Sequence, residues 1–262
     1  MPVDLLVSKV EIFMLVLVRM TGVFVISPVF GRRNLPVYFK IGFSLILAVI
    51  LTSTVALPDI HIPDSLLMFA VLVLEEFLIG VIIGFISYLF FSSVYLAGQL
   101  VDTQIGFGMA NVIDPMSNMQ IPITSNLYFI ICILLLLSMN GHHMIIKALF
   151  DSFTIVPPGH VSFGNGVLVE DIIRIFSNIF IIGLKISAPV VATILISDVA
   201  LGIIMRTVPQ LNFFVVGAPL KILLGLIVIS ITLIFFKTLA SSLISGMNTE
   251  THNVLDHLKK VD

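Results

Sequence analysis

Charged side chains are scarce in this sequence. Aspartate, glutamate, lysine and arginine make up 11% of the 262 residues, whereas hydrophobic residues make up 58%. A soluble domain typically carries about 25% charged residues. The few charged side chains of this chain could not cover the surface of a water-soluble globule of its size. Lipid is the alternative solvent, and a helix of about 20 apolar residues crosses it because all its backbone hydrogen bonds are internal. The composition therefore predicts an all-α integral membrane protein.

A basic excess and a set of cysteines are also missing. The chain has 13 lysines and arginines against 15 aspartates and glutamates, with no basic tract, which argues against nucleic-acid binding and a polybasic lipid anchor. Cys132 is the only cysteine, so no internal disulfide is expected. The apolar run after Lys9 resembles a signal peptide, but Arg19 interrupts it and no small-x-small cleavage site follows. We expect Met1 onward to be mature protein.

Catalytic and metal-binding motifs are absent as well. The sequence contains no G-x-S-x-G, Walker, Rossmann or C-x-x-C pattern. Adjacent His142 and His143 would point about 100° apart on a helix, and the nearby acids Asp151 and Glu170 lack metal-ligand spacing. We therefore predict no enzyme, no cofactor and no metal. An intramembrane enzyme using this histidine pair and a carboxylate is the alternative, and it would require a bound metal.

What the sequence does have is about six apolar segments of uneven length. The third, Leu66–Leu100, is longer than a hydrocarbon core of about 30 Å requires, and the fourth, Leu127–Met139, is too short to cross alone. Between the fourth and fifth segments, the stretch from Asn140 through Gly166 is interpreted as loop. We predict a single membrane domain, residues 1–262, with a polar C-terminal tail at 248–262. The segments are Val10–Phe30, Ile41–Leu57, Leu66–Leu100, Leu127–Met139, Ile172–Met205 and Leu211–Met247.

Several charges interrupt the apolar segments, where each costs about 2.5–3.5 kcal/mol to insert. They either mark a proton or ion route, or pair with one another or with neighbouring subunits; we favour pairing. Asp198 lies one turn before Gly202 on a segment that ends near Arg206, and Lys221 on the next segment is its expected partner. The interrupting charges are Arg19, Glu75, Glu76, Lys185, Asp198, Lys221 and Lys237.

The segment Gln99–Asn126 is the least helix-like long stretch, rich in glycine, asparagine, glutamine and methionine. Non-helical backbone at membrane depth persists only where protein or water covers it. Glycines allow a sharp turn around a bulky apolar residue, and methionines form a deformable surface. This pattern suits a plug in a pore, although an ordinary exposed connection fits the composition equally well. The candidate sealing residues are Gly106, Phe107, Gly108, Met109, Met116 and Met119.

A series of short motifs in a fixed order extends over nearly the whole chain. With them, the sequence resembles the FliR family of flagellar export-gate proteins, whose counterparts serve injectisome type III secretion. The motifs are Arg19, Pro28-Val29-Phe30-Gly31, Pro36, Gly98-Gln99-Leu100-Val101-Asp102, Gly106-Phe107-Gly108, Asp114-Pro115, Gly141-His142, Ser152-Phe153, Pro157, Asp198, Gly202, Arg206, Pro209-Gln210-Leu211-Asn212, Gly217 and Pro219-Leu220-Lys221.

The resemblance implies a pore-forming subunit of an export gate in the flagellar basal body of the bacterial inner membrane. It implies FliP-like and FliQ-like partners, then FlhB-like and FlhA-like proteins, and passage of unfolded protein substrates. It also implies bent helical hairpins in a helical hetero-oligomer and a plug at Gly106-Phe107-Gly108. We expect Asp198, Arg206 and Lys221 to act in assembly. The alternatives are an injectisome gate subunit and a small-solute secondary transporter, which would show an inverted repeat.

Overall fold

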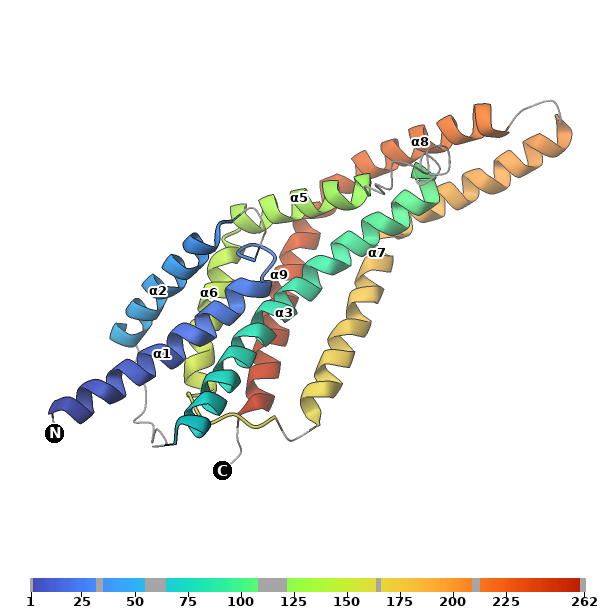
Figure 1. Ribbon diagram of the computed structural model, residues 1–262. Coiled ribbons are helices and arrows are strands. Elements are labelled where there is room, and N and C mark those ends of the chain that lie inside the picture. Colours follow the sequence, from blue (N-terminus) through green and yellow to red (C-terminus); the bar gives the residue numbers. More distant parts are fainter. Residues whose placement is uncertain are drawn as a thin grey trace. The chain divides into compact units, whose positions relative to one another are not determined.

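In the computed structural model, residues 2–31, 35–54, 65–107, 122–163, 166–208 and 213–259 are described. All the elements named in these ranges are helices (Figure 1), which confirms the all-α prediction. Their bounds are α1 Pro2–Ile26, α2 Val37–Thr54, α3 Leu66–Ile105, α5 Ile123–Ser138, α6 Gly141–Ile155, α7 Val167–Thr207, α8 Phe213–Thr232, the 3-10 helix η3 Leu233–Phe235, and α9 Phe236–Leu258.

Four helical stretches in the described ranges are long and apolar enough to cross a membrane: α2, α3, α7 and the continuous stretch Val216–Leu258. The pair α5 and α6, broken at Asn140, adds a fifth if it forms one span. The first predicted segment is not among them, because every 18-residue stretch of α1 contains Lys9, Glu11 and Arg19. Several candidate spans are therefore present, although fewer than the six apolar segments.

The helices divide into two compact units. The first unit comprises Met1–Leu89, Asn140–Ile175 and Ile244–Asp262. Within it, α1 packs along α2 (Figure 1). Three phenylalanines join the end of α1 to α2: the Phe24 ring lies 4.9 Å from that of Phe30 and 5.4 Å from that of Phe43, both edge to face. Such aromatic pairs add to the apolar area that holds the two helices together.

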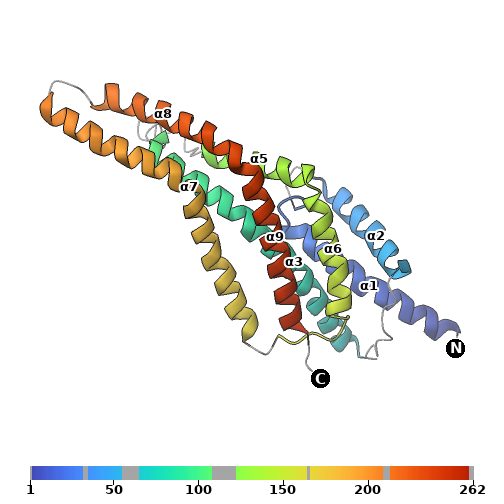
Figure 2. The ribbon, with the colours of Figure 1, turned by 180° about the vertical axis from the view of Figure 1, so that it is seen from behind.

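The predicted polar tail is helical as far as Leu258 and packs inside the first unit. Figure 2 shows this end of α9 beside α6. Its apolar residues Val254, Leu255 and Leu258 are buried, because the spacing i, i+1, i+4 places them on one face. On the polar side, His257 Nδ1 lies 2.6 Å from Asp171 Oδ2, and Glu250 Oε2 accepts a hydrogen bond from Arg174 at 2.9 Å. The tail is a docked helix in the part of the chain that the structure describes.

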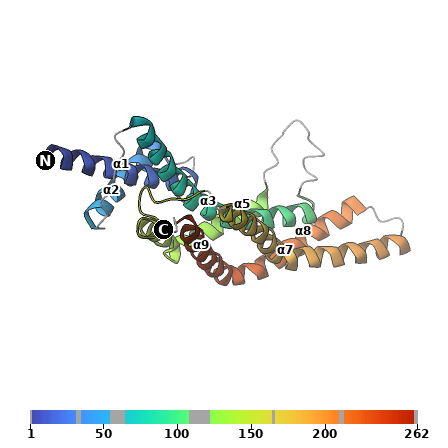
Figure 3. The ribbon, with the colours of Figure 1, turned by 90° about the horizontal axis from the view of Figure 1, so that it is seen from below.

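The second unit comprises Phe90–Met139 and Phe176–Leu243. Here α7 and α8 run antiparallel as a long hairpin (Figure 3). Ile105, at the end of α3, packs against Gly225 of α8. The Ile105 side chain occupies the space that a Cβ on Gly225 would need. Tyr128 of α5 is fully buried, and its ring lies 4.8 Å from the ring of Phe236.

Two predicted boundaries are wrong. The stretch after Asn140 was expected to be loop, yet Gly141–Ile155 forms α6 and buries Ile145, Ala148 and Leu149 with Ser152 on one face at helical spacing. In addition, α3 continues to Ile105, well into the predicted discontinuity at Gln99–Asn126. The polar residues at the end of α3 resemble a loop in the sequence. They are helical because this end of α3 packs against Ser125 of α5 and Gly225 of α8, and these contacts join segments that are distant in the sequence.

Candidate functional site

The predicted sealing segment begins where α3 ends. Gly106 adopts φ of 93°, a left-handed conformation that favours glycine, and its N–H donates to the carbonyl of Asp102 at 3.1 Å. Phe107, half-buried, follows this turn. The structure therefore ends the helix at the first glycine of the predicted motif. The other predicted sealing residues, Gly108, Met109, Met116 and Met119, lie outside the described residues.

The far end of the same segment is held by Asp102. Its carboxylate accepts hydrogen bonds from the backbone N–H of Thr124, at 2.9 Å to Oδ1, and of Ser125, at 3.4 Å to Oδ2. These are orphan donors of the first turn of α5, which begins after Pro122 without a side-chain cap of its own. A buried aspartate is a good N-terminal cap because its negative charge faces the positive end of the helix. One residue thus anchors both ends of the connection between α3 and α5.

Close packing supports this anchor. Gly98 of α3 lies directly against the backbone of Ser125 at the start of α5, leaving no room for a Cβ. The absence of a side chain at Gly98 allows α5 to approach closely enough for the Asp102 carboxylate to reach its N–H groups. We name Asp102, Gly98 and the first turn of α5 the loop anchor.

The charges predicted to act in assembly lie on the α7–α8 hairpin. Lys221 Nζ of α8 forms an ion pair with Asp198 Oδ1 of α7, as the sequence suggested. Arg206 is exposed in the last turn of α7, where a cation interacts favourably with the helix dipole. The structure brings Asp198 and Lys221 together but gives Arg206 no ion pair among the described residues.

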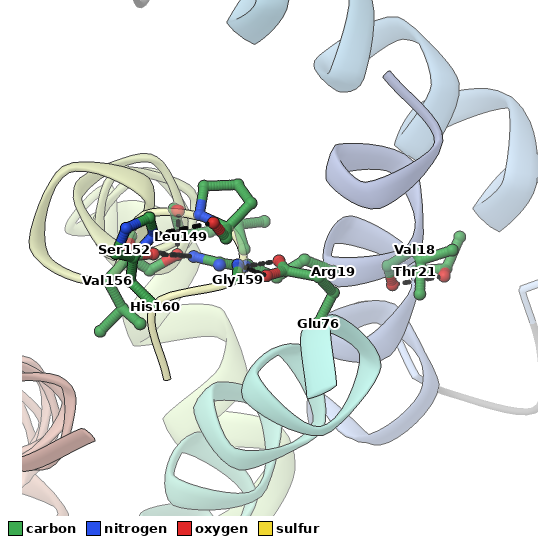
Figure 4. A network of polar contacts seen from close by, with 10 residues as sticks. Val18, Arg19, Thr21, Glu76, Leu149, Ser152, Val156, Gly159 and His160 are labelled. Carbon is green, nitrogen blue, oxygen red and sulfur yellow. Dashed lines mark hydrogen bonds and ion pairs between the residues drawn. The ribbon is translucent and has the colours of Figure 1, made fainter. Parts of the chain in front are cut away.

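A second polar cluster lies in the core of the first unit, around Arg19 (Figure 4). Arg19 of α1 and Glu76 of α3 have side chains with 0% exposure, and Arg19 Nε lies 2.6 Å from Glu76 Oε2. The other carboxylate oxygen of Glu76 accepts a hydrogen bond from Gly159 N–H at 3.4 Å. A fully buried carboxylate and guanidinium are tolerated only when they are paired in this way.

The same guanidinium caps the C-terminal end of α6. Arg19 Nη1 donates to the carbonyls of Ser152 and Val156, each at 3.0 Å. Its central carbon lies 4.1 Å from the centroid of the Phe153 ring, where the π face attracts the cation. Carbonyls at a helix C-terminus carry partial negative charge. The Ser152 carbonyl also accepts the N–H of Val156 at 2.9 Å, and its second lone pair accepts the guanidinium. Arg19 therefore joins α1, α3 and α6 at one point.

Two glycines let α1 and α3 meet beside this ion pair. A Cβ on Gly22 would lie 2.6 Å from the carbonyl oxygen of Phe77, and a Cβ on Gly80 would collide with the carbonyl of Arg19. Only glycine permits such a close approach of two helix backbones. The crossing brings Arg19 and Glu76 within direct contact.

The sequence marks Arg19 and Glu76 as costly charges but does not predict that they pair with each other, nor that Ser152 and Asp102 hold neighbouring helices. One sequence feature could have predicted the Arg19–Glu76 contact: an arginine and a glutamate on two apolar segments, each one turn before a glycine. Four residues contribute to this feature: Arg19 with Gly22, and Glu76 with Gly80.

The histidine pair shows no metal-site geometry. The rings of His142 and His143 lie 4.1 Å apart, centroid to centroid. Within the described ranges, no group of three or more histidine, cysteine, aspartate or glutamate residues is placed to hold a metal ion.

Taken together, the helices of the described ranges, the four candidate spans among them and the charges paired between helices define a polytopic helical membrane protein. The profile of the family "Bacterial export proteins, family 1" matches residues 10–247, and the chain belongs to this family.

Curated relatives point the same way. The chain is 40% identical over 220 residues to the flagellar biosynthetic protein FliR of Bacillus subtilis (strain 168), covering 83% of this chain and 84% of that protein. It is 31% identical to FliR of Pectobacterium carotovorum subsp. carotovorum, over 97% of this chain and 96% of the relative. With FliR of Escherichia coli (strain K12) it shares 26% identity, over 84% and 83%. The resemblance to the FliR family is confirmed.

Proposed function

We propose that the chain is a structural, noncatalytic, pore-forming subunit of the flagellar type III protein export gate. The observation that supports this most strongly is the match of residues 10–247 to a family of bacterial export proteins, together with relatives that are flagellar biosynthetic proteins. The family match extends over both compact units. The proposal therefore concerns the whole chain.

Exposed apolar side chains support assembly with other membrane chains. Tyr38 of α2 is 88% exposed and Ile234 of η3 is 76% exposed, and such surfaces need lipid or another protein to cover them. We propose FliP-like and FliQ-like subunits as direct neighbours, with FlhB-like and FlhA-like proteins beyond them. The complex would sit in the inner membrane within the basal body and pass unfolded protein substrates.

The connection between α3 and α5 is the proposed plug. Its first residues, Gly106 and Phe107, leave the end of α3 beside the loop anchor, so the segment between 107 and 122 is tethered at both ends. A tethered loop can occupy a pore and return to the same place after opening. In this proposal, Gly108, Met109, Met116 and Met119 complete the seal through deformable apolar contacts.

The relatives favour a flagellar over an injectisome gate, because those compared are flagellar proteins. A small-solute transporter would work as an isolated chain, whereas a gate subunit requires its neighbours. Arg206 is exposed and has no ion pair among the described residues, which fits a gate subunit that contacts neighbours.

The test is removal of the gene from a flagellated host, with the tagged chain returned on a plasmid. We expect secretion of flagellar proteins into the medium to be lost and then restored, and the tagged chain to co-purify with FliP-like and FliQ-like proteins. Secretion that continues without the chain, or a tagged chain that purifies alone, would contradict the proposal.

A further inference from the structure

Lys185 of α7 differs from the paired charges of the long helices. Arg19 pairs with Glu76, and Lys221 pairs with Asp198. Lys185 is exposed and makes neither an ion pair nor a hydrogen bond with any described residue. Lys237 of α9 is likewise exposed, two residues after the 3-10 turn Leu233–Phe235, whereas Lys185 lies eighteen residues inside α7, one turn before Pro189.

The neighbours of Lys185 on the outside of α7 are apolar. Leu184 is 58% exposed, and Ile181, one turn earlier, is 49% exposed. On the opposite side, Ile186 and Val190 are buried in the second unit. The ammonium group is thus carried on a surface that, in a candidate membrane span, faces lipid or another chain.

The position along the helix argues against a lipid headgroup as the partner. The nearest charged residues along α7 are Arg174, eleven residues earlier, and Asp198, thirteen residues later. At about 1.5 Å per residue the nearer of these is some 16 Å away, roughly half of a hydrocarbon core of about 30 Å. When the stretch between Arg174 and Asp198, whose single charged residue is Lys185, is centred in the bilayer, the lysine side chain cannot extend to the interface.

We propose that Lys185 forms an ion pair with an aspartate or glutamate presented by an apolar helix of a neighbouring gate subunit. The inference rests on the proposed function, since it requires a neighbouring chain at membrane depth. A charge facing the hydrocarbon core is costly, and a carboxylate from a partner supplies both the countercharge and a hydrogen-bond acceptor. Lys185 is therefore an interaction residue that selects an acidic partner helix.

Replacing the lysine with leucine separates this assignment from simple lipid exposure. Lys185→Leu makes the outer face of α7 more apolar, so a lipid-facing position would accept it without loss. If a partner carboxylate is there, the same change leaves that carboxylate unpaired, and assembly is weakened by truncating one member of a buried pair. The two situations predict opposite results for the same variant.

The experiment uses the assembled complex in native membranes. The tagged wild-type chain, Lys185→Leu, Lys185→Arg and the neighbouring apolar control Leu184→Ala are expressed in the gene-deleted host. Co-purified gate proteins are quantified per tagged chain. In parallel, wild-type membranes are treated with a hydrophobic carbodiimide, which joins a lysine amine to a touching carboxylate, and the linked peptides are identified by mass spectrometry.

We expect a cross-link from Lys185 to an acidic residue in an apolar segment of another protein. Lys185→Leu should lower co-purification by about tenfold or more, while Lys185→Arg and Leu184→Ala stay near wild type. Normal co-purification of Lys185→Leu, or a cross-link only within the same chain, would overturn the inference while leaving the proposed function intact. A wild-type chain that retains no gate protein would overturn both. If Lys185→Leu fails to accumulate, the wild-type cross-link alone decides.

Discussion

Two ion pairs among the described residues join different helices of this chain. Arg19 and Glu76 are fully buried and in contact, and Nη1 of Arg19 donates to the carbonyls of Ser152 and Val156 at the end of α6. The Asp198–Lys221 pair joins α7 to α8 in the same manner. In a low-dielectric surrounding, the loss of one partner costs more than the pair contributes. These residues therefore fix which helices meet and in which register.

Single substitutions at the Arg19–Glu76 pair should be more damaging than the double substitution. Arg19→Met or Glu76→Met leaves an uncompensated buried charge and should destabilise the chain by about 3–5 kcal/mol, whereas Arg19→Met/Glu76→Met removes both charges and should recover part of that loss. Thermal unfolding of the purified chain in detergent measures the difference. Additive losses in the double variant would show that the two side chains do not depend on each other.

At the α7–α8 hairpin, Asp198→Asn should reduce recovery of the assembled complex, because Lys221 then lacks its countercharge. The exchanged pair Asp198→Lys/Lys221→Asp should restore part of it. Glu170→Gln is a matched control, since Glu170 is an exposed carboxylate at the other end of the same helix. Complex recovery and secretion by Asp198→Asn at wild-type levels would remove the assembly role from this residue.

The sequence predicted one of these pairs and missed the other for a physical reason. Asp198 and Lys221 lie on consecutive apolar segments, which form a hairpin by default, so opposite charges near their facing ends suggest a contact. Arg19 and Glu76 lie on non-consecutive segments, and the third participant, Ser152, comes from a helix that was read as loop. Long-range packing decides such a meeting, and one sequence does not encode it in any local pattern.

At the level of helices, glycines determine which elements cross closely. The α1–α3 crossing depends on Gly22 and Gly80, and the α3–α5 crossing depends on Gly98. The apolar runs predicted most of the long helices, because continuous hydrophobicity indicates them directly. The helix α6 and the end of α9 escaped prediction, since each is amphipathic and interrupted by histidines or polar residues that pair only in the folded chain.

Gly80→Ala should destabilise the first unit, because the new methyl group overlaps the carbonyl of Arg19 and backbone must shift. Overpacking of this kind costs about 1–3 kcal/mol. Gly42→Ala is the matched control, since a Cβ there meets no atom within 4 Å and alanine favours a helix. The midpoint of thermal unfolding should fall for the first variant and stay level or rise for the second. Equal midpoints would contradict the close crossing.

Asp102→Ala should loosen the loop anchor while leaving the long helices in place. The N–H groups of Thr124 and Ser125 lose their cap, which is worth about 1 kcal/mol and up to about 2 kcal/mol in buried settings. Hydrogen exchange of the first turn of α5 should accelerate, with the middle of α3 unchanged; Asp102→Glu, which keeps the charge on a longer side chain, is the comparison. Unchanged exchange at Thr124 and Ser125 would exclude the capping role.

At the scale of the whole molecule, the apolar segments differ in length, as expected for a chain whose exposed apolar surfaces are covered by neighbouring subunits. Four stretches of the described residues are long and apolar enough to cross a membrane, α1 with Lys9, Glu11 and Arg19 is not among them, and the α5–α6 pair is broken at Asn140. Large apolar side chains remain exposed on α2, α7 and α8. The proposed assembly with other membrane helices would cover such surfaces.

Ion conductance of the purified, closed export complex in a lipid bilayer tests the proposed plug, once the connection between α3 and α5 has been replaced by a sequence without apolar side chains. Residues 108–121 are replaced by glycine and serine at equal length, which keeps Gly106, Phe107 and the loop anchor; the same replacement at 55–64 is the control. If this connection seals the pore, conductance rises for the first variant and stays at the wild-type level for the control. Wild-type conductance in both variants would contradict the account.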